Sequence, residues 1–114
     1  MNKEDYQVRL AEILARCPYQ EVAKEKLATT LAMVNAAGIE MTLVQQLTLT
    51  SHLCAMVERS YDGGEIPEVD PAMFSEVSDL ALDLAERVCD LLPNLATGEK
   101  YLLSIHFESA RMNS

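Results

Sequence analysis

Residues 42–60 read TLVQQLTLTSHLCAMVERS, and this stretch decides the fold prediction. Thr42 and Gln45 have the spacing of a capping box, in which two side chains satisfy the first free backbone groups of a helix. Apolar residues then recur at intervals of three and four as far as about Ser60. The stretch therefore predicts a single amphipathic helix of about five turns.

The same helix divides into two faces when its side chains are placed at about 100° per residue. His52 shares a narrow sector with Gln45, Thr48 and Arg59. The apolar side lies opposite and contains Leu43, Leu47, Cys54 and Val57. His52 is thus expected on the polar face, and Arg59 lies two turns along, where its guanidinium could approach an anion held at His52.

Four further blocks with helical periodicity lie around this one. The first is capped by Asn2 and closed by Pro18, and the second runs from about Tyr19 to Ala37 with Gly38 at its end. After a turn-rich segment at 62–67, Asp70 and Pro71 predict a fourth helix that continues to about Leu92, and Thr97 is expected to cap a fifth.

The fold class that follows is all-α. We expect residues 1–114 to form one domain, a five-helix bundle with antiparallel helix pairs and the last helix lying across them. Composition agrees: 49% of residues are hydrophobic but only 5% are aromatic and tryptophan is absent, so the core must be aliphatic, which favours helices over a sheet.

The formal net charge of −9 is unevenly distributed. Residues 1–59 carry six basic and seven acidic side chains, whereas residues 60–114 carry three and eleven. An acidic surface repels phosphate backbones and anionic lipid headgroups, so we expect no direct nucleic-acid binding and no membrane partner. The chain has neither an apolar stretch long enough to cross a bilayer nor a cleavable signal, and we expect a cytoplasmic protein.

The cysteines and carboxylates give little support to an enzyme or a metal site. Cys17, Cys54 and Cys89 are scattered through helical patterns, as reduced buried thiols would be, and no pair has the ligand spacing of a structural zinc site. Glycine-rich phosphate loops and nucleophile motifs are absent from the sequence. We therefore expect no catalytic residue, no cofactor and no bound metal.

A stripe of acidic side chains on the predicted fourth helix has two interpretations. Docking of a basic partner is one, and a solvated helix face is the more common one. The stripe comprises Glu76, Asp79, Asp83, Glu86 and Asp90.

His52 and His106 are the only histidines, and they carry the functional hypothesis. An imidazole titrates near neutral pH and can act as acid, base, ligand or phosphoryl acceptor. His106 has Leu102 and Leu103 one turn before it, and Glu99 two turns before it near the helix start. A half-buried, hydrogen-bonded ring is as compatible with this pattern as a reactive one, so the residues by themselves favour His52.

These motifs, in this order, resemble the phosphotransferase-system regulation domain, or PRD. The resemblance rests on residues 49–59 with His52 and Arg59 seven apart, a glycine-containing loop, Asp70-Pro71, and then Glu99-x-Tyr-Leu-x-x-x-His106. It extends from about Tyr6 to Arg111 as a single copy. PRDs are five-helix domains of bacterial antiterminators and transcriptional activators of sugar operons.

The resemblance implies specific roles. His52 and His106 match phospho-acceptor histidines, Arg59 matches the accompanying arginine, and Glu99 matches the acid that precedes the second histidine. The implied donor is the phosphocarrier or a sugar-specific component of the phosphotransferase system, and the implied assembly is a homodimer. Because no basic module lies at either end, the expected output is self-association or control of a separate transcriptional regulator.

Two other functions remain open on the sequence. A histidine-phosphotransfer module of two-component signalling also displays a histidine on a helical bundle, but it needs only one. A purely structural interaction domain would need neither ring. The PRD function and the histidine-phosphotransfer function are distinguished by whether His52 and His106 line a common surface.

Overall fold

The computed structural model describes residues 1–113, which form five α-helices and one short 3-10 helix and contain no strand. The elements are α1 (Lys3–Ala15), α2 (Gln20–Ala36), α3 (Leu43–Asp62), η1 (Pro71–Phe74), α4 (Asp79–Cys89) and α5 (Glu99–Arg111). The predicted all-α bundle of five helices is confirmed. Within residues 1–113, no helix combines the length and the apolar character that a bilayer crossing requires.

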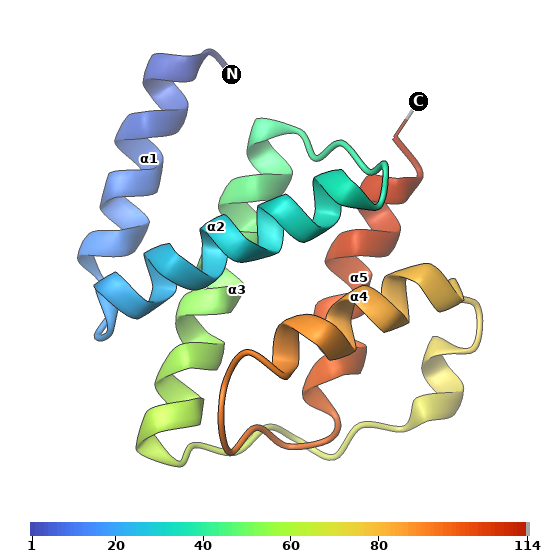
Figure 1. The fold of residues 1–114 in the computed structure, drawn as a ribbon. Coiled ribbons are helices and arrows are strands. Elements are labelled where there is room, and N and C mark those ends of the chain that lie inside the picture. The colour runs from blue at the N-terminus through green and yellow to red at the C-terminus, as the bar shows by residue number, and fades with distance from the viewer. Residues whose placement is uncertain (114) are drawn as a thin grey trace.

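The helices form two crossing layers (Figure 1). In one layer α2 and α4 run antiparallel and in contact. In the other, α3 contacts both α1 and α5, and α5 runs antiparallel to α3. The last helix therefore lies across α4, as predicted, while it follows α3 lengthwise. This second contact positions the candidate site.

The core lies between the two layers and is mainly aliphatic, although it includes the fully buried ring of Phe107 and the buried ring of Tyr6. Helix α3 lies in the middle of its layer and contributes the largest share of the buried side chains. The principal core residues are Ala23, Leu27 and Val34 of α2, Leu49, Leu53, Met56 and Val57 of α3, Ala81, Leu84, Ala85 and Val88 of α4, and Leu103, Phe107 and Ala110 of α5.

Several predicted helix ends are confirmed. The Asn2 side chain accepts a hydrogen bond from Asp5 N at 2.8 Å and caps α1. Thr42 and Gln45 form the reciprocal capping box at the start of α3. Gly38 follows α2 with φ of 78°, a left-handed conformation that a residue with a Cβ adopts only under strain.

The predicted fourth helix, from Pro71 to about Leu92, is wrong at its start. Asp70 does cap a helix at Pro71, but this is η1, which ends at Phe74. Helix α4 begins at Asp79, where the Ser78 hydroxyl accepts a hydrogen bond from Ala81 N. The Ser78 backbone N–H and hydroxyl both donate to the Glu108 carboxylate of α5, a tertiary contact that fixes the chain direction before α4.

The predicted cap of the fifth helix is also wrong. Helix α5 begins after Gly98, and no side chain caps it; Thr97 makes no such hydrogen bond. The Glu99 and Tyr101 backbone N–H groups instead donate to carbonyls of the preceding turn, those of Ala96 and Gly98. A Cβ at Gly98 would lie 3.0 Å from Val69 Cγ2, so close packing against the 63–78 connection favours glycine here.

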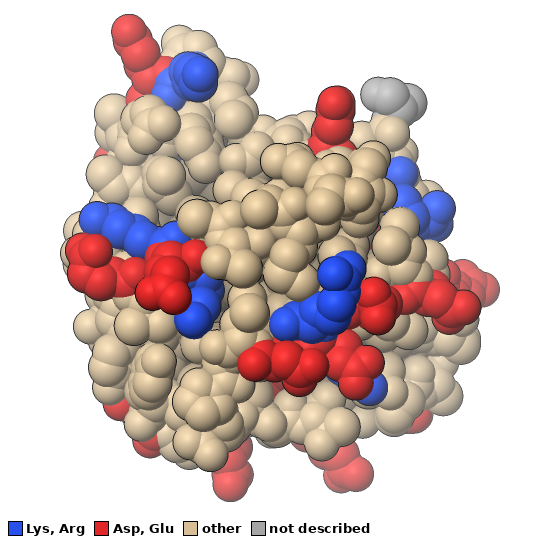
Figure 2. Space-filling view, viewed as in Figure 1, with Lys and Arg blue, Asp and Glu red and all other residues tan. Residues whose placement is uncertain are grey.

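The acidic stripe is exposed to solvent, as both of its interpretations require. Glu76, Asp79, Asp83, Glu86 and Asp90 are all exposed, and Arg87 lies among them, paired with Asp83 at 3.1 Å. Figure 2 shows basic and acidic side chains together over α4 and a second mixed group near the start of α2, separated by uncharged surface. The stripe is therefore partly neutralised rather than continuous.

One buried hydroxyl in the core lacks a partner, which generates a stability prediction. Thr30 is fully buried in α2, and its Oγ1 makes no hydrogen bond. Because an unpaired buried hydroxyl is destabilising, Thr30→Val should raise the free energy of unfolding by about 1 kcal/mol. Urea denaturation measures this change.

Thr29→Val is the matched control, because Thr29 is exposed and its hydroxyl donates to Glu25 O in the same helix. It should change stability by less than about 0.5 kcal/mol. A Thr30→Val protein no more stable than the wild type would show that the hydroxyl is satisfied in solution.

Candidate functional site

Three polar pairs lie along the antiparallel contact of α3 and α5, the one at the end of α5 through Asn113, two residues past the helix. Gln45 meets Asn113, His52 meets His106, and Arg59 meets Glu99. Each step of seven residues forward in α3 is matched by seven backward in α5, so successive pairs are two turns, or about 10 Å, apart. A repeat of seven keeps the same helix face turned toward its neighbour. The sequence spacing His52 to Arg59 therefore has its counterpart in Glu99 to His106.

Arg59 and Glu99 form a bidentate ion pair. Arg59 Nε donates to Glu99 Oε2 at 2.7 Å, and a terminal nitrogen of Arg59 donates to Oε1 at 2.8 Å. The Glu99 side chain is 2% exposed and that of Arg59 is 22% exposed. A carboxylate this deeply buried is stable in its charged form only with such a partner. The Arg59 side chain is therefore partly buried against Glu99 rather than fully exposed to solvent. The sequence did not indicate this pairing.

His52 and His106 form the middle pair. His52 Nδ1 lies 3.1 Å from His106 Nε2, within hydrogen-bond distance, and the rings meet edge to face at 81° with centroids 4.9 Å apart. Both side chains are half-buried. The two histidines that the sequence singled out, 54 residues apart, therefore belong to one site between α3 and α5.

The remaining two ring nitrogens have different surroundings. His52 Nε2 is buried and makes no hydrogen bond, one of only two such side-chain atoms within residues 1–113. His106 Nδ1 also makes no hydrogen bond, but it is not among the buried atoms. The ring nitrogen of the pair that is neither buried nor hydrogen-bonded is therefore His106 Nδ1. The sequence had favoured His52 as the accessible ring, because it predicted that His52 lies on the polar face of its helix.

Both rings are held in their neutral form. Burial, followed by His106 and the Arg59 charge, lowers the pKa of His52 from 6.5 to about 4, against a smaller opposing effect of Glu99. Burial also lowers the pKa of His106. At neutral pH each imidazole therefore has one unprotonated nitrogen, whose electron pair can accept a hydrogen bond or attack an electrophile.

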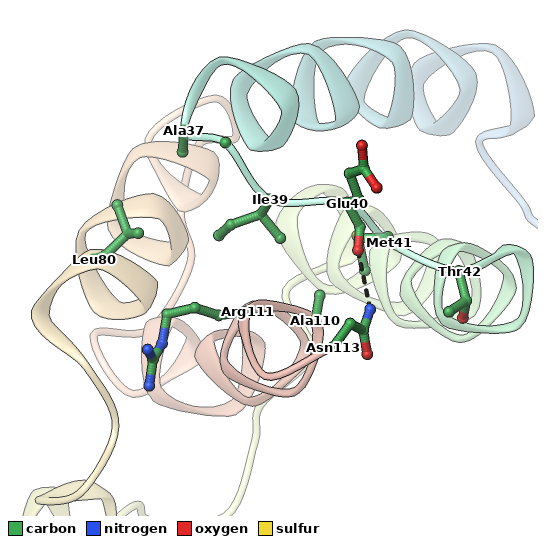
Figure 3. A pocket seen from close by; sticks show the side chains of 10 residues that line it. Ala37, Ile39, Glu40, Met41, Thr42, Leu80, Ala110, Arg111 and Asn113 are labelled. Atoms are coloured by element: carbon green, nitrogen blue, oxygen red, sulfur yellow. Dashed lines mark hydrogen bonds between the residues drawn. The ribbon is translucent and has the colours of Figure 1, made fainter.

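The third pair lies next to a cavity of about 500 Å³ (Figure 3). Asn113 donates to Glu40 O at 3.0 Å and exchanges hydrogen bonds with the Gln45 amide, which ties the end of α5 to the start of α3. The lining residues, which include Leu80 and Arg111, contain neither histidine. The histidine pair lies on the α3–α5 contact, outside this cavity.

Within residues 1–113 the cysteines take part in no group of three or more possible metal ligands. All three are free thiols, with Cys17 and Cys54 buried and Cys89 partly buried. Burial, aided by a hydrogen bond with Cys17, raises the pKa of Cys54 to about 12, and burial likewise raises that of Cys89 to about 12. Both thiols stay protonated at neutral pH and are poor nucleophiles or metal ligands.

The structure places all four residues predicted from the sequence on the α3–α5 contact, as two pairs that lie two turns apart, and it shows two contacts that were not predicted. The Arg59–Glu99 and Gln45–Asn113 pairs were not predicted. The sequence did contain a signal for the Arg59–Glu99 pair, because His52 and Arg59 are seven residues apart and so are Glu99 and His106. Equal spacing leads to contact only when the two helices pack antiparallel in the right register.

The ion pair predicts an asymmetric response to mutation. Arg59→Met leaves the buried Glu99 carboxylate unpaired and should lower the free energy of unfolding by about 3 kcal/mol. The double variant Arg59→Met/Glu99→Leu also removes the Glu99 charge, so it should be more stable than Arg59→Met. Urea denaturation of both proteins measures the difference.

Arg87→Met is the matched control, since it breaks the exposed pair with Asp83. Its effect should stay below about 1 kcal/mol. An Arg59→Met protein as stable as the Arg87→Met protein would contradict the importance of the buried pair.

The lowered histidine pKa values predict that stability depends on pH. Below pH 6.5 the histidines of the unfolded chain bind protons more readily than those of the folded protein, whose pKa values are lower. The free energy of unfolding should therefore fall as the pH is lowered from 6.5 to about 4. Glu108, whose pKa is lowered from 4.5 to about 2 by Arg111 and Ser78, begins to contribute only near pH 5.5. Urea midpoints across the upper part of this range isolate the histidines.

The double variant His52→Asn/His106→Asn is the control, because asparagine does not titrate there. Its stability should change much less with pH between 6.5 and 4.5. Proton NMR of the two rings should also give midpoints below 6.5. Midpoints at or above that value would contradict the assigned environment.

Comparison with known proteins identifies the family. No protein-family model matches this chain, and no curated protein matches it. A solved structure, described as a PRD-containing transcription regulator from Lactobacillus casei ATCC 334, is 38% identical, with a TM-score of 0.88 over 91% of this chain and 93% of that one. Identity at this level over nearly the whole of both chains, on the same helical fold, shows that this protein belongs to the PRD family.

Proposed function

We propose that this regulatory domain is phosphorylated on histidine by proteins of the phosphotransferase system, and that phosphate controls its self-association or its binding to a separate transcriptional regulator. The observation that carries the proposal is the contact between His52 Nδ1 and His106 Nε2 at 3.1 Å. The donor would be the phosphocarrier or a sugar-specific component. The domain itself is the acceptor and performs no catalysis.

The protonation state of the pair supports this role. A histidine attacks phosphorus through an unprotonated nitrogen, so an acceptor must be neutral at the pH of the cell. The lowered pKa values of His52 and His106 meet this requirement. The site also lies on the α3–α5 contact rather than in the cavity of Figure 3, which suits a donor that is itself a protein.

Arg59 supports the proposal electrostatically. Two of its five N–H donors are used by Glu99, and its side chain remains 22% exposed. Its charge already influences His52. A phosphoryl group on the pair would attract the same guanidinium and compete with Glu99, so the ion pair gives the site a means of sensing the added charge.

Added charge also supplies the output. A phosphoryl group contributes roughly −1.5 to −2 charges, and it would do so on a chain with a net charge of −9. Repulsion between two such surfaces would weaken a homodimer across this face, whereas a basic partner would bind more tightly. The relative named as a transcription regulator supports a partner in transcription control.

A histidine-phosphotransfer module of two-component signalling is less well supported. Such a module needs a single accessible histidine, whereas here each ring occupies a nitrogen of the other. Membership of the PRD family favours the first function.

The test is phosphorylation in a defined mixture. The protein is incubated with phosphoenolpyruvate, enzyme I and the phosphocarrier, and intact mass is measured before and after mild acid treatment. We expect an acid-labile adduct of one phosphoryl group that disappears in the His52→Ala/His106→Ala protein. Sedimentation of the phosphorylated and unphosphorylated samples should then give different average masses, with or without an added regulator.

A mixture without phosphoenolpyruvate is the control for adventitious modification. Absence of an adduct on the folded wild-type protein, with the phosphocarrier shown to be phosphorylated and with phosphorylated sugar-specific components also tested as donors, would refute the proposal. Transfer only from a histidine kinase through a receiver would support the two-component alternative.

A further inference from the structure

Of the four ring nitrogens in the histidine pair, one is available to an incoming group. His52 Nδ1 and His106 Nε2 are joined to each other. His52 Nε2 is buried without a partner. His106 Nδ1 makes no hydrogen bond and is not buried. A donor approaching the α3–α5 contact therefore meets one nitrogen with an unused electron pair or proton.

The hydrogen bond between the rings decides which tautomer makes that nitrogen a nucleophile. If His106 carries its proton on Nε2 and donates it to His52 Nδ1, then His106 Nδ1 has a free electron pair and His52 carries its own proton on Nε2. The reverse tautomer would place a proton on the open nitrogen and block attack. The first arrangement is the reactive one.

We infer that His106 Nδ1 is the phosphoryl-accepting atom and that His52 is a positioning residue that holds the His106 ring, so that the pair takes one phosphoryl group. This inference rests on the proposed function and specifies its site. The Nδ1 electron pair of His106 forms the new N–P bond as the N–P bond of the donor phosphohistidine breaks. The donor ring, protonated on its other nitrogen, leaves as neutral imidazole.

His52 also stabilises the product. Attack through Nδ1 leaves the phosphorylated His106 ring with its proton on Nε2 and with the positive charge that the donor ring has lost. In the reactive tautomer that N–H already donates to His52 Nδ1, which lies 3.1 Å from Nε2. A hydrogen bond from a charged donor is stronger than one from a neutral donor, so the contact strengthens as the phosphoryl group arrives.

A second phosphoryl group is disfavoured for two reasons. His52 Nδ1 is engaged and Nε2 is sealed, so the His52 ring would first have to break its bond with His106 and turn outward. Two phosphoryl groups would then lie close together on rings whose centroids are 4.9 Å apart, with one arginine nearby. The pair therefore behaves as one acceptor.

The experiment locates the adduct by atom. Protein labelled with ¹⁵N in its histidine rings is phosphorylated by the phosphoenolpyruvate mixture and, separately, by potassium phosphoramidate, a small phosphoryl donor that needs no docking. Nitrogen NMR distinguishes Nδ1 from Nε2 substitution, and peptide mapping under alkaline conditions assigns the residue. We expect one phosphoryl group, on His106 Nδ1, from both donors.

Variants of His52 test the positioning role. His52→Ala should keep the adduct on His106 but slow its formation about tenfold, as expected for the loss of one hydrogen bond. His52→Asn places an amide oxygen near the position of Nδ1 and should recover most of that rate. A merely structural role for His52 would not give this rescue together with unchanged Nδ1 selectivity. His106→Ala should abolish the adduct while the protein stays folded by circular dichroism.

The outcomes separate this inference from the proposed function. No adduct on wild-type protein from either the phosphocarrier or the sugar-specific components would refute the proposed function, and phosphoramidate would then decide the inference alone. An adduct on His52, an adduct on Nε2 of His106, or two phosphoryl groups per chain would overturn the inference even where the phosphocarrier works as donor. Equal rates for the alanine and asparagine variants of His52 would overturn the positioning role.

Discussion

The antiparallel register of α3 and α5 is the constraint on which the site depends, and the Arg59–Glu99 pair enforces it. Glu99 is 1% exposed, so a shift of one helix relative to the other would leave its carboxylate buried without a partner. Breaking a buried pair in this way costs about 3–5 kcal/mol, comparable with much of the stability of a small domain. The ion pair therefore fixes which residues of the two helices meet.

The contact between His52 and His106 is a consequence of that register. Two turns from the ion pair, the rings are brought together at a depth where burial keeps them neutral while one nitrogen stays open. The same short stretch of helix surface thus holds two neutral imidazoles and a cation already engaged by a buried anion. Under the proposed function, a phosphoryl group on the pair would compete with Glu99 for that cation and so act on the interaction that fixes the helices.

Helix α4, in the other layer, helps to hold α5 in place against α3. Glu108 of α5 accepts hydrogen bonds from Ser78, at the start of α4, and from Arg111 in its own helix. These partners lower the pKa of Glu108 to about 2, so the link between α4 and α5 persists at any physiological pH. At the far end of α5, Asn113 binds the start of α3 through Gln45 and the loop before it through Glu40 O. Helix α5 is therefore fixed along its whole length.

Local sequence determined the five helices, most of their caps and the candidate residues, because helical periodicity and capping depend on neighbours within one turn. It placed Asn2, Thr42 and Gly38 correctly at helix ends. The start of α4 at Asp79 and the uncapped start of α5 depended on tertiary contacts, with Glu108 and with the 63–78 connection. The pairing of Arg59 with Glu99, the burial of His52 Nε2 and the opening of His106 Nδ1 were also decided there. A helix azimuth shows which side chains share a face, but only the packed neighbour determines which atoms of that face reach water.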